Sequence, residues 1–240
     1  MFTLYLRERF PLPIFGPAAL GIAAAAGWTS PAAPTAAAFI YAIVMSALLL
    51  LQFRLWDDLE DRAGDSATHP ERVLVRTPAA PYRRVLMGLA IANVATCGIA
   101  GWPAAVEIAL VDLAFYAAYH RTRRRVSDRI WRYSILLLKY PAFVVVVSTT
   151  LGPTQPGRLA AAALVAYLTA CGYEALHGNV RVCHGGRGGS ILRFDLSADP
   201  RVVSSNVEGR GLRNRIFPPV LRVLRGGTAV LRTFLAHVTS

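Results

Sequence analysis

The chain has 240 residues, of which 54% are hydrophobic and only 17% are charged, and its mean hydropathy is +0.41. This composition is too apolar for an ordinary soluble domain and indicates a protein that crosses a membrane several times. The formal net charge of +12 fits basic loops against anionic lipid, so we expect membrane lipid and no nucleic acid among its partners.

The first predicted element follows an N-terminus, "MFTLYLRERFPLP", that lacks the features of a cleaved signal peptide. We therefore expect the first apolar run to stay in the protein as a membrane span. Since a span needs roughly 17–20 apolar residues, the sequence predicts six of them, over 12–28, 35–53, 84–101, 104–119, 133–152 and 158–173. The predicted fold class is an all-α, polytopic transmembrane helix bundle of about six spans within residues 1–180.

The connections between these spans differ sharply in charge. Those after the first, third and fifth spans carry a single basic residue, Arg158. Residues 54–84 and 120–132 hold six arginines each. Because basic loops stay in the cytoplasm, this alternation predicts an integral protein of the plasma (inner) membrane whose N-terminus and acidic loop are cytoplasmic.

Residues 181–240 form a basic tail without an apolar run long enough to span a membrane. Within it, residues 215–238 mix arginines with Leu, Val and Phe, which fits a helix lying on an anionic membrane surface. A disordered basic tail is the alternative.

The second predicted span runs directly into an acidic segment, "DDLEDRAGD", at residues 57–65. On a helix, Asp58, Asp61 and Asp65 share one face, where like charges repel. Mg²⁺ would offset this repulsion, since it is commonly held by one or two carboxylates together with phosphate oxygens. The candidates for holding the phosphates are the neighbouring arginines Arg62, Arg72 and Arg76. The alternative is a solvated acidic loop that these arginines neutralise.

This segment resembles the first aspartate-rich motif of the UbiA superfamily of intramembrane prenyltransferases, [N/D]-D-x-x-D-x-x-x-D, which also follows the second span. Asp58, Asp61 and Asp65 match the aspartates of the family, and Asp57 stands where the family usually has Asn. Arg72, in "HPERVL", matches a downstream arginine. The resemblance implies that the four aspartates bind the metal and that Arg72 binds the substrate.

Two further segments resemble parts of the same family. "FYAAYHRTRRR", at 115–125, resembles a segment after the fourth span and implies that Tyr119, Arg121 and Arg123 bind substrate. A second aspartate motif is expected after the sixth span, where "CGYEALHGNV" offers Glu174 as its only acid. The resemblance implies that Glu174 is a catalytic metal ligand, with assistance from His177 and Asn179. It covers residues 1–180, whereas the family normally has nine spans.

Two ionisable residues, Asp112 and Lys139, lie within predicted spans, each about 10 Å from the cytoplasmic end. An ionisable group at that depth is costly unless it is paired or faces a polar cavity. We therefore expect either that Asp112 and Lys139 form a structural ion pair or that both face a substrate cavity. In the second case Lys139 would reach the diphosphate.

The resemblance implies a Mg²⁺-dependent transferase that moves a prenyl group from an isoprenyl diphosphate to an aromatic or lipid-like acceptor and releases pyrophosphate. Tyr116, Tyr119 or Tyr140 would stabilise the allylic cation. Replacing Asp58 or Asp61 by Ala is expected to abolish transfer with little loss of fold, because charge repulsion is relieved.

Two other functions are weighed against this one. The first is a non-catalytic or truncated membrane protein derived from the same family. The second is an alcohol phosphatidyltransferase, which is disfavoured because the D-G-x-x-A-R opening of that family is absent.

Overall fold

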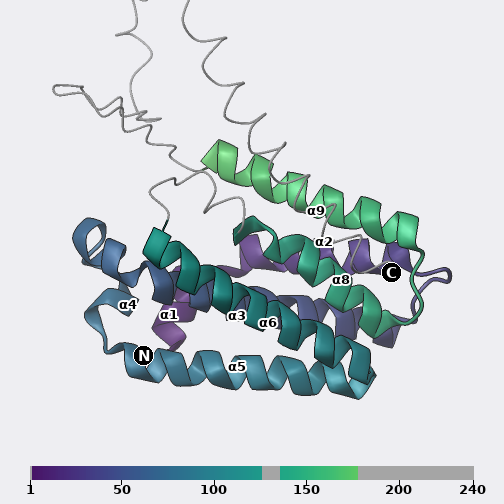
Figure 1. The fold of residues 1–240 in the computed structure, drawn as a ribbon, viewed down its shortest axis with the longest axis horizontal. Coiled ribbons are helices and arrows are strands. Elements are labelled where there is room, and N and C mark those ends of the chain that lie inside the picture. The colour runs from purple at the N-terminus through teal and green to yellow at the C-terminus, as the bar shows by residue number, and fades with distance from the viewer. Residues whose placement is uncertain (1, 126–135, 178–240) are drawn as a thin grey trace, which may run out of the picture.

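The computed structural model describes residues 2–125 and 136–177, and every regular element in these ranges is an α-helix. The helices are α1 (Phe2–Arg9), α2 (Leu12–Thr29), α3 (Ala36–Thr68), α4 (Val73–Arg76), α5 (Ala79–Ala100), α6 (Trp102–Arg125), α8 (Lys139–Leu151) and α9 (Pro156–His177). Figure 1 shows the long helices lying lengthwise beside one another, with α5 along one edge, α9 along the other, and α1 and α4 at one end. The predicted all-α bundle is confirmed.

Four helices in the described part of the chain are long and apolar enough to cross a membrane, namely α2, α3, α5 and α6. They correspond to the first four predicted spans. The fifth and sixth predicted spans overlap with α8, an apolar helix of only 13 residues, and α9, of 22 residues. The tail 181–240 and Asn179 lie outside the described residues.

Helix α3 continues well beyond the predicted end of the second span at Phe53. Its 33 residues correspond to a length of about 50 Å, whereas the hydrocarbon core of a bilayer is about 30 Å thick. The acidic segment therefore belongs to a helix that extends past the apolar part of the bundle, whereas the sequence predicts a span that ends at residue 53 and is followed by a connecting loop.

Local sequence explains where several helices begin and end. The Thr35 hydroxyl caps α3 by accepting a hydrogen bond from the Ala38 amide at 3.2 Å. Helix α3 stops before His69, because the residue preceding a proline, here Pro70, is disfavoured in helical conformation. Helix α8 ends at Leu151 and is followed by Gly152, whose φ of +114° suits a residue without a Cβ.

Helix α8 lies at the centre of the bundle. It packs against α2, α3, α6 and α9, and its residues from Pro141 to Ser148 are all buried. The Phe53 ring of α3 lies 5.2 Å from Phe115 of α6 and 5.0 Å from Phe143 of α8, so one aromatic residue joins three helices. A short helix that is apolar on all sides is expected when neighbours enclose it.

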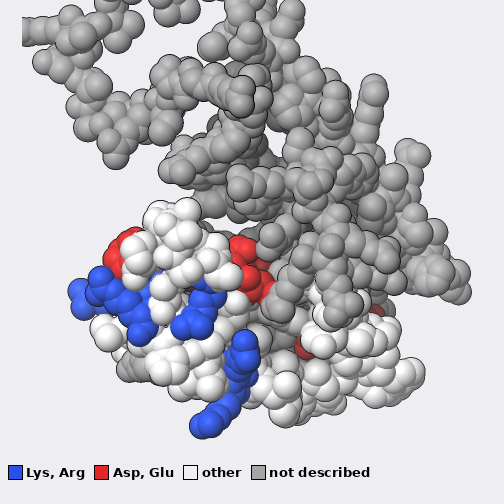
Figure 2. Space-filling view, turned by 60° about the vertical axis from the view of Figure 1, so that its left-hand side comes forward, with Lys and Arg blue, Asp and Glu red and all other residues white. Residues whose placement is uncertain are grey.

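The two ends of the bundle differ in character. At one end lie the short connections: the Tyr41 hydroxyl donates to the Thr96 carbonyl at 2.7 Å, and the Gln155 amide donates to the Thr29 carbonyl at 2.9 Å. At the other end lie α1, α4 and the acidic part of α3. Figure 2 turns that end towards the viewer and shows basic and acidic side chains gathered on its described surface.

Candidate functional site

The acidic part of α3 faces several different helices. Consecutive residues on an α-helix point about 100° apart, so Asp57 and Asp58 meet different neighbours. Asp57 contacts α6 and α8, whereas Asp58 contacts α1. The first two aspartates of the motif therefore point towards different sides of α3.

Asp58 is held in a buried cluster and is only 4% exposed. Its Oδ2 accepts hydrogen bonds from the Tyr5 hydroxyl at 2.9 Å and from Arg9 Nε at 3.0 Å, and its Oδ1 lies 2.5 Å from a second Arg9 nitrogen. Arg54, one turn earlier on α3, lies 3.3 Å from the same Oδ1. One carboxylate thus receives a bidentate arginine, a second arginine and a phenol.

The titration behaviour of Tyr5 and Arg9 follows from this cluster. Burial, and then the neighbouring Asp58 carboxylate, raise the pKa of Tyr5 well above its ordinary value. Burial disfavours the charged form of Arg9, but its hydrogen bond to Asp58 and the attraction between the two outweigh burial and raise the pKa of Arg9. Tyr5 therefore remains a hydrogen-bond donor and Arg9 a cation at neutral pH.

The structure contradicts the premise behind the expectation that Asp58→Ala leaves the fold nearly intact. The expectation assumed that the carboxylates mainly repel one another. In the structure Asp58 neutralises Arg9 and Arg54 in a largely buried setting, and removing one partner of such a cluster leaves the others uncompensated.

Asp57 forms the second cluster, with Lys139 and Tyr119. Its Oδ2 accepts a hydrogen bond from Lys139 Nζ, and its Oδ1 accepts one from the Tyr119 hydroxyl. Lys139 is 7% exposed and Tyr119 is 3% exposed, so both groups meet Asp57 within the bundle. Three helices that are distant in sequence therefore converge on the first carboxylate of the motif.

The expectation that Lys139 pairs with Asp112 is wrong. Lys139 is the first residue of α8 and lies level with Tyr119, whereas Asp112 lies seven residues, or about 10 Å, further along α6. Asp112 Oδ1 instead accepts a hydrogen bond from Gln52 Nε2 at 2.6 Å. The alternative in which Asp112 and Lys139 both face a substrate cavity stays a prediction.

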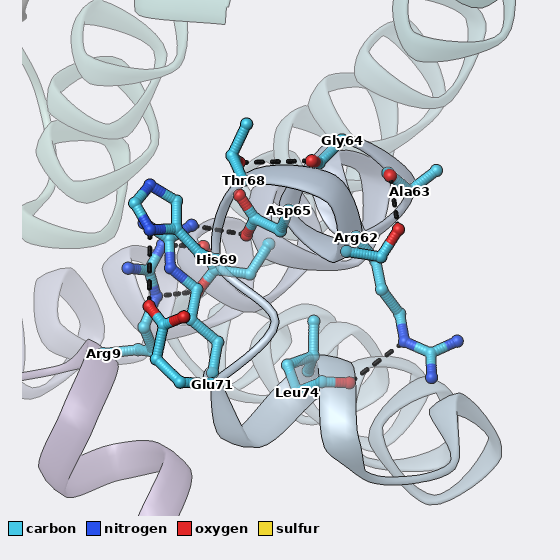
Figure 3. Close-up of polar contacts among 12 residues, drawn as sticks. Arg9, Arg62, Ala63, Gly64, Asp65, Thr68, His69, Glu71 and Leu74 are labelled. Atoms are coloured by element: carbon cyan, nitrogen blue, oxygen red, sulfur yellow. Dashed lines mark hydrogen bonds and ion pairs between the residues drawn. The ribbon is translucent and has the colours of Figure 1, made fainter.

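Asp65 and the nearby arginines lie at the far end of α3 (Figure 3). Asp65 Oδ2 lies 2.5 Å from the Arg72 guanidinium, so the two residues matched to the family motif contact each other. Arg62 points away from Asp65, and its guanidinium donates to the carbonyls of Leu74, Val75 and Thr77. Arg62 therefore stabilises the α4 segment rather than lining the same surface as Asp65.

The remaining candidates lie on helices near this end. Asp61 is exposed on α3, one turn after Asp57. Arg121, Arg123 and Glu174 belong to the helical ends of α6 and α9, but their side chains lie outside the described part of the structure. The placement of a second metal-binding motif therefore stays a prediction.

An aromatic layer borders the Asp57 cluster on the side of the bundle interior. The Trp56 and Tyr119 rings are 5.3 Å apart, and Phe53 lies 5.6 Å from Trp56. Tyr140 continues the layer through Phe143 at 6.0 Å. Tyr116, by contrast, is 62% exposed and lies on the outer side of α6, so it does not contribute to this layer.

A buried polar network lies deeper in the bundle. Asn93 Nδ2 donates to Gln52 Oε1 at 2.6 Å, and Gln52 in turn donates to Asp112. Asn93 and Gln52 are fully buried, and the network joins α3, α5 and α6. Hydrogen bonding offsets the cost of placing these groups at membrane depth.

Sequence reasoning missed the groups that surround Asp58. Arg54 precedes Asp58 by four residues, so the helical i, i+4 pairing was a signal for it. Tyr5 and Arg9 are also four residues apart, which places them on one face of a helix. Nothing in their spacing, however, identifies a partner 49 or more positions away.

The described part of the acidic end offers carboxylates as possible ligands for Mg²⁺. Carboxylate oxygens are the hard ligands that this ion prefers. Among the residues that the structure describes, however, no three His, Cys, Asp or Glu side chains converge as a metal-binding group. Binding of Mg²⁺ by one or two carboxylates together with phosphate oxygens, which is common for this ion, therefore stays a prediction.

Comparison with known proteins finds no matching family model, no matching curated protein and no matching solved structure. The function is therefore inferred from the motif residues and their geometry.

Proposed function

We propose that this protein is an integral membrane prenyltransferase that uses Mg²⁺ to bind an isoprenyl diphosphate and transfers the prenyl group to an aromatic or lipid-like acceptor, releasing pyrophosphate. The observation that carries the proposal is the meeting of Asp57 with Lys139 and Tyr119, from three separate helices, at the boundary between charged and aromatic layers. Such a boundary suits a substrate with a charged head and an apolar chain.

The charged layer would receive the diphosphate. A Mg²⁺ ion held by Asp58, Asp61 or Asp65 would neutralise the departing pyrophosphate. Lys139 offers a buried cation for the phosphate oxygens, and Arg72 offers a second one from the loop after α3. Asp57 and Glu174 complete the proposed ligand set, and Arg121 and Arg123 add positive charge at the end of α6.

The aromatic layer would receive the reacting carbon. When the bond between that carbon and the diphosphate oxygen breaks, its electron pair leaves with pyrophosphate and an allylic cation remains. The faces of Trp56, Tyr119 and Tyr140 can stabilise this charge, and the apolar packing of Phe53 and Phe143 excludes water that would quench it. The acceptor then forms the new bond and releases a proton.

The surrounding membrane and its sidedness are part of the proposal. Four apolar helices indicate a membrane protein. The connections at the Asp57 end are basic, whereas those at the opposite end carry almost no charge. Because basic loops stay in the cytoplasm, this difference favours a cytoplasmic position for the Asp57 end. We assign the protein on this basis to the plasma (inner) membrane, where a water-soluble diphosphate head is accessible from the cytoplasm.

A second candidate function is a non-catalytic membrane protein derived from the UbiA superfamily. The observation that favours it is the saturation of Asp58 by Tyr5, Arg9 and Arg54. A carboxylate with these partners is also what a purely structural ion-pair cluster would contain.

Release of pyrophosphate separates the two functions. The purified, folded chain is incubated in lipid nanodiscs with farnesyl or geranylgeranyl diphosphate and a membrane lipid extract, with Mg²⁺ or with EDTA. Mg²⁺-dependent pyrophosphate release that Asp61→Ala abolishes is expected of the transferase. Absence of release with either donor, from protein that unfolds cooperatively, would favour the non-catalytic protein.

A further inference from the structure

We propose that exposed arginines at the Asp57 end of the bundle bind the phosphate groups of anionic phospholipids in the adjoining leaflet of the membrane. This basic face consists of Arg7 of α1, Arg76 of α4, and Arg83 and Arg84 of α5, all of which are exposed. The inference concerns the lipid around the protein and goes beyond the proposed function, because it involves neither the acidic motif nor the reaction.

The other arginines with described side chains at this end are bound within the protein. Arg9 and Arg54 contact Asp58. Arg72 contacts a second aspartate of α3, and Arg62 donates to backbone carbonyls. For the guanidinium groups of the basic face, by contrast, no carboxylate or hydrogen-bond partner lies among the described residues. Their charges are therefore available to an anion.

Tertiary packing gathers the basic face from three helices. Tyr5 of α1, Leu74 of α4 and Tyr82 of α5 are buried together in a small hydrophobic cluster, and the two tyrosine rings lie 5.7 Å apart. Arg7 and Arg76 each come two residues after a buried member of this cluster, and residues two apart on an α-helix point about 200° apart. The arginines therefore project outward from the same packed unit, and Figure 2 shows basic side chains over the described surface at this end.

Helix α5 sets the depth of these charges in the membrane. It is one of the helices long and apolar enough to span a bilayer. Arg84, Met87 and Ile91 are exposed at the spacing i, i+3, i+7, so the stripe that begins with a charge continues with apolar side chains. From Arg84 to Ala100 the helix rises about 24 Å, and the hydrocarbon core is about 30 Å thick. An arginine side chain that extends towards the interface therefore reaches the phosphate layer.

A phospholipid matches both parts of this stripe. A guanidinium can bind phosphate oxygens through two parallel hydrogen bonds, and the apolar residues that follow Arg84 can lie along an acyl chain. Attraction to charged headgroups falls off within about 8 Å at physiological ionic strength, so the arginines must lie near the level of the phosphates. A nucleic acid would meet the charges but has no apolar chain for the rest of the stripe, which favours lipid as the partner.

Lipid retention tests the basic face. The purified full chain, in micelles of an uncharged detergent, is titrated with phosphatidylglycerol or with zwitterionic phosphatidylcholine of the same acyl chains, and bound lipid is measured as phosphorus after gel filtration. Wild type should bind phosphatidylglycerol more tightly, and this preference should shrink as NaCl is raised. Arg83→Gln and Arg84→Gln should each weaken phosphatidylglycerol binding by about 5-fold. The variant with all four arginines replaced by glutamine should bind the two lipids equally.

The matched control is Arg158→Gln. Arg158 is exposed at the opposite end of the bundle, where it donates to the carbonyls of Trp28 and Ser30, so its replacement should leave the lipid preference unchanged. The fourfold variant should keep the wild-type unfolding temperature in phosphatidylcholine, because its four side chains make no ion pair or hydrogen bond with the described residues. Lost preference in that variant then reports on lipid binding rather than on misfolding.

Three results would overturn the inference. Equal binding of the two lipids by wild type, or an undiminished preference in the fourfold variant, would show that these arginines do not select anionic lipid. Displacement of phosphatidylglycerol by single-stranded RNA at equal concentration would assign the basic face to nucleic acid instead. No prenyl donor is present in the assay, so each of these results leaves the proposed function standing.

Discussion

Lys139, the first residue of α8, donates a hydrogen bond to Asp57, which lies 82 positions earlier on α3. The contact joins the central helix of the bundle to the acidic end of its longest helix. Tyr119 of α6 donates to the other oxygen of the same carboxylate. Asp57 therefore accepts two buried donors from two other helices, and several predictions about stability depend on this arrangement.

Removing Lys139 alone should be more harmful than removing the whole pair. Lys139→Met leaves Asp57 without its cation in the bundle, and we expect it to lower the free energy of unfolding by about 3–5 kcal/mol. The double variant Asp57→Asn/Lys139→Met should recover most of that loss. Unfolding in mixed micelles, followed by circular dichroism, measures both values. Equal and additive losses from the two substitutions would show that the pair contributes no coupling.

Asp58 and Asp61 should differ in their effect on folding. Asp58→Ala leaves Arg9 and Arg54 uncompensated and should lower the free energy of unfolding by about 3–5 kcal/mol. Asp61 is exposed, so Asp61→Ala should cost less than about 1 kcal/mol, as expected for a surface charge. The same unfolding assay compares them. Similar small losses for both variants would contradict the structural role of the Tyr5–Arg9–Asp58 cluster.

The buried polar network should depend on its central member. Gln52→Leu removes both the donor to Asp112 and the acceptor for Asn93, leaving the buried Asn93 and the partly buried Asp112 without these hydrogen bonds. We expect a loss of about 2–4 kcal/mol, because each buried group left without a partner costs about 1–3 kcal/mol. Thr96→Val is the control, since the exposed Thr96 hydroxyl bonds only to its own helix. A loss no larger than that of the control would show that the network is not needed for stability.

Tyr5 should make stability fall at alkaline pH. Its pKa is raised above the ordinary value near 10 by burial and by Asp58, so the folded state holds this proton more tightly than the unfolded state. The contribution is complete below pH 10 and is lost as the pH rises above it. The stability advantage of wild type over Tyr5→Phe should therefore be constant from pH 8 to 9.5 and shrink by pH 11. An advantage that grows with pH would contradict the environment assigned to Tyr5.

Membrane sidedness can be tested with single cysteines in a variant that lacks the three native ones. Ala32→Cys lies in the short connection between α2 and α3, and Ala67→Cys lies at the acidic end of α3; both positions are exposed. Because basic segments stay in the cytoplasm, a membrane-impermeant maleimide should label position 32 in intact cells and position 67 only after permeabilisation. The reverse pattern would overturn the proposed orientation.

Much of the architecture was predictable from local pattern. Apolar run length is a property of consecutive residues, so the predicted spans overlap with α2, α3, α5, α6, α8 and α9, and the first four of these helices are long and apolar enough to cross a membrane. The helical state of the acidic segment was also predictable, since no proline interrupts the sequence between Thr35 and His69. The candidate site was predictable only as a set of charges at one end of the bundle.

By itself, the sequence determined an all-helical membrane protein with acidic and basic groups concentrated at one end, because hydrophobicity and charge act over neighbouring residues. Which cation meets which carboxylate depends on how the helices pack in three dimensions. Lys139 pairs with Asp57 rather than Asp112, and Arg9 with Asp58, because helix packing sets the relative depth of α1, α3, α6 and α8. Ion pairs act over a few ångströms, so a shift of two helical turns between neighbouring helices changes every partner.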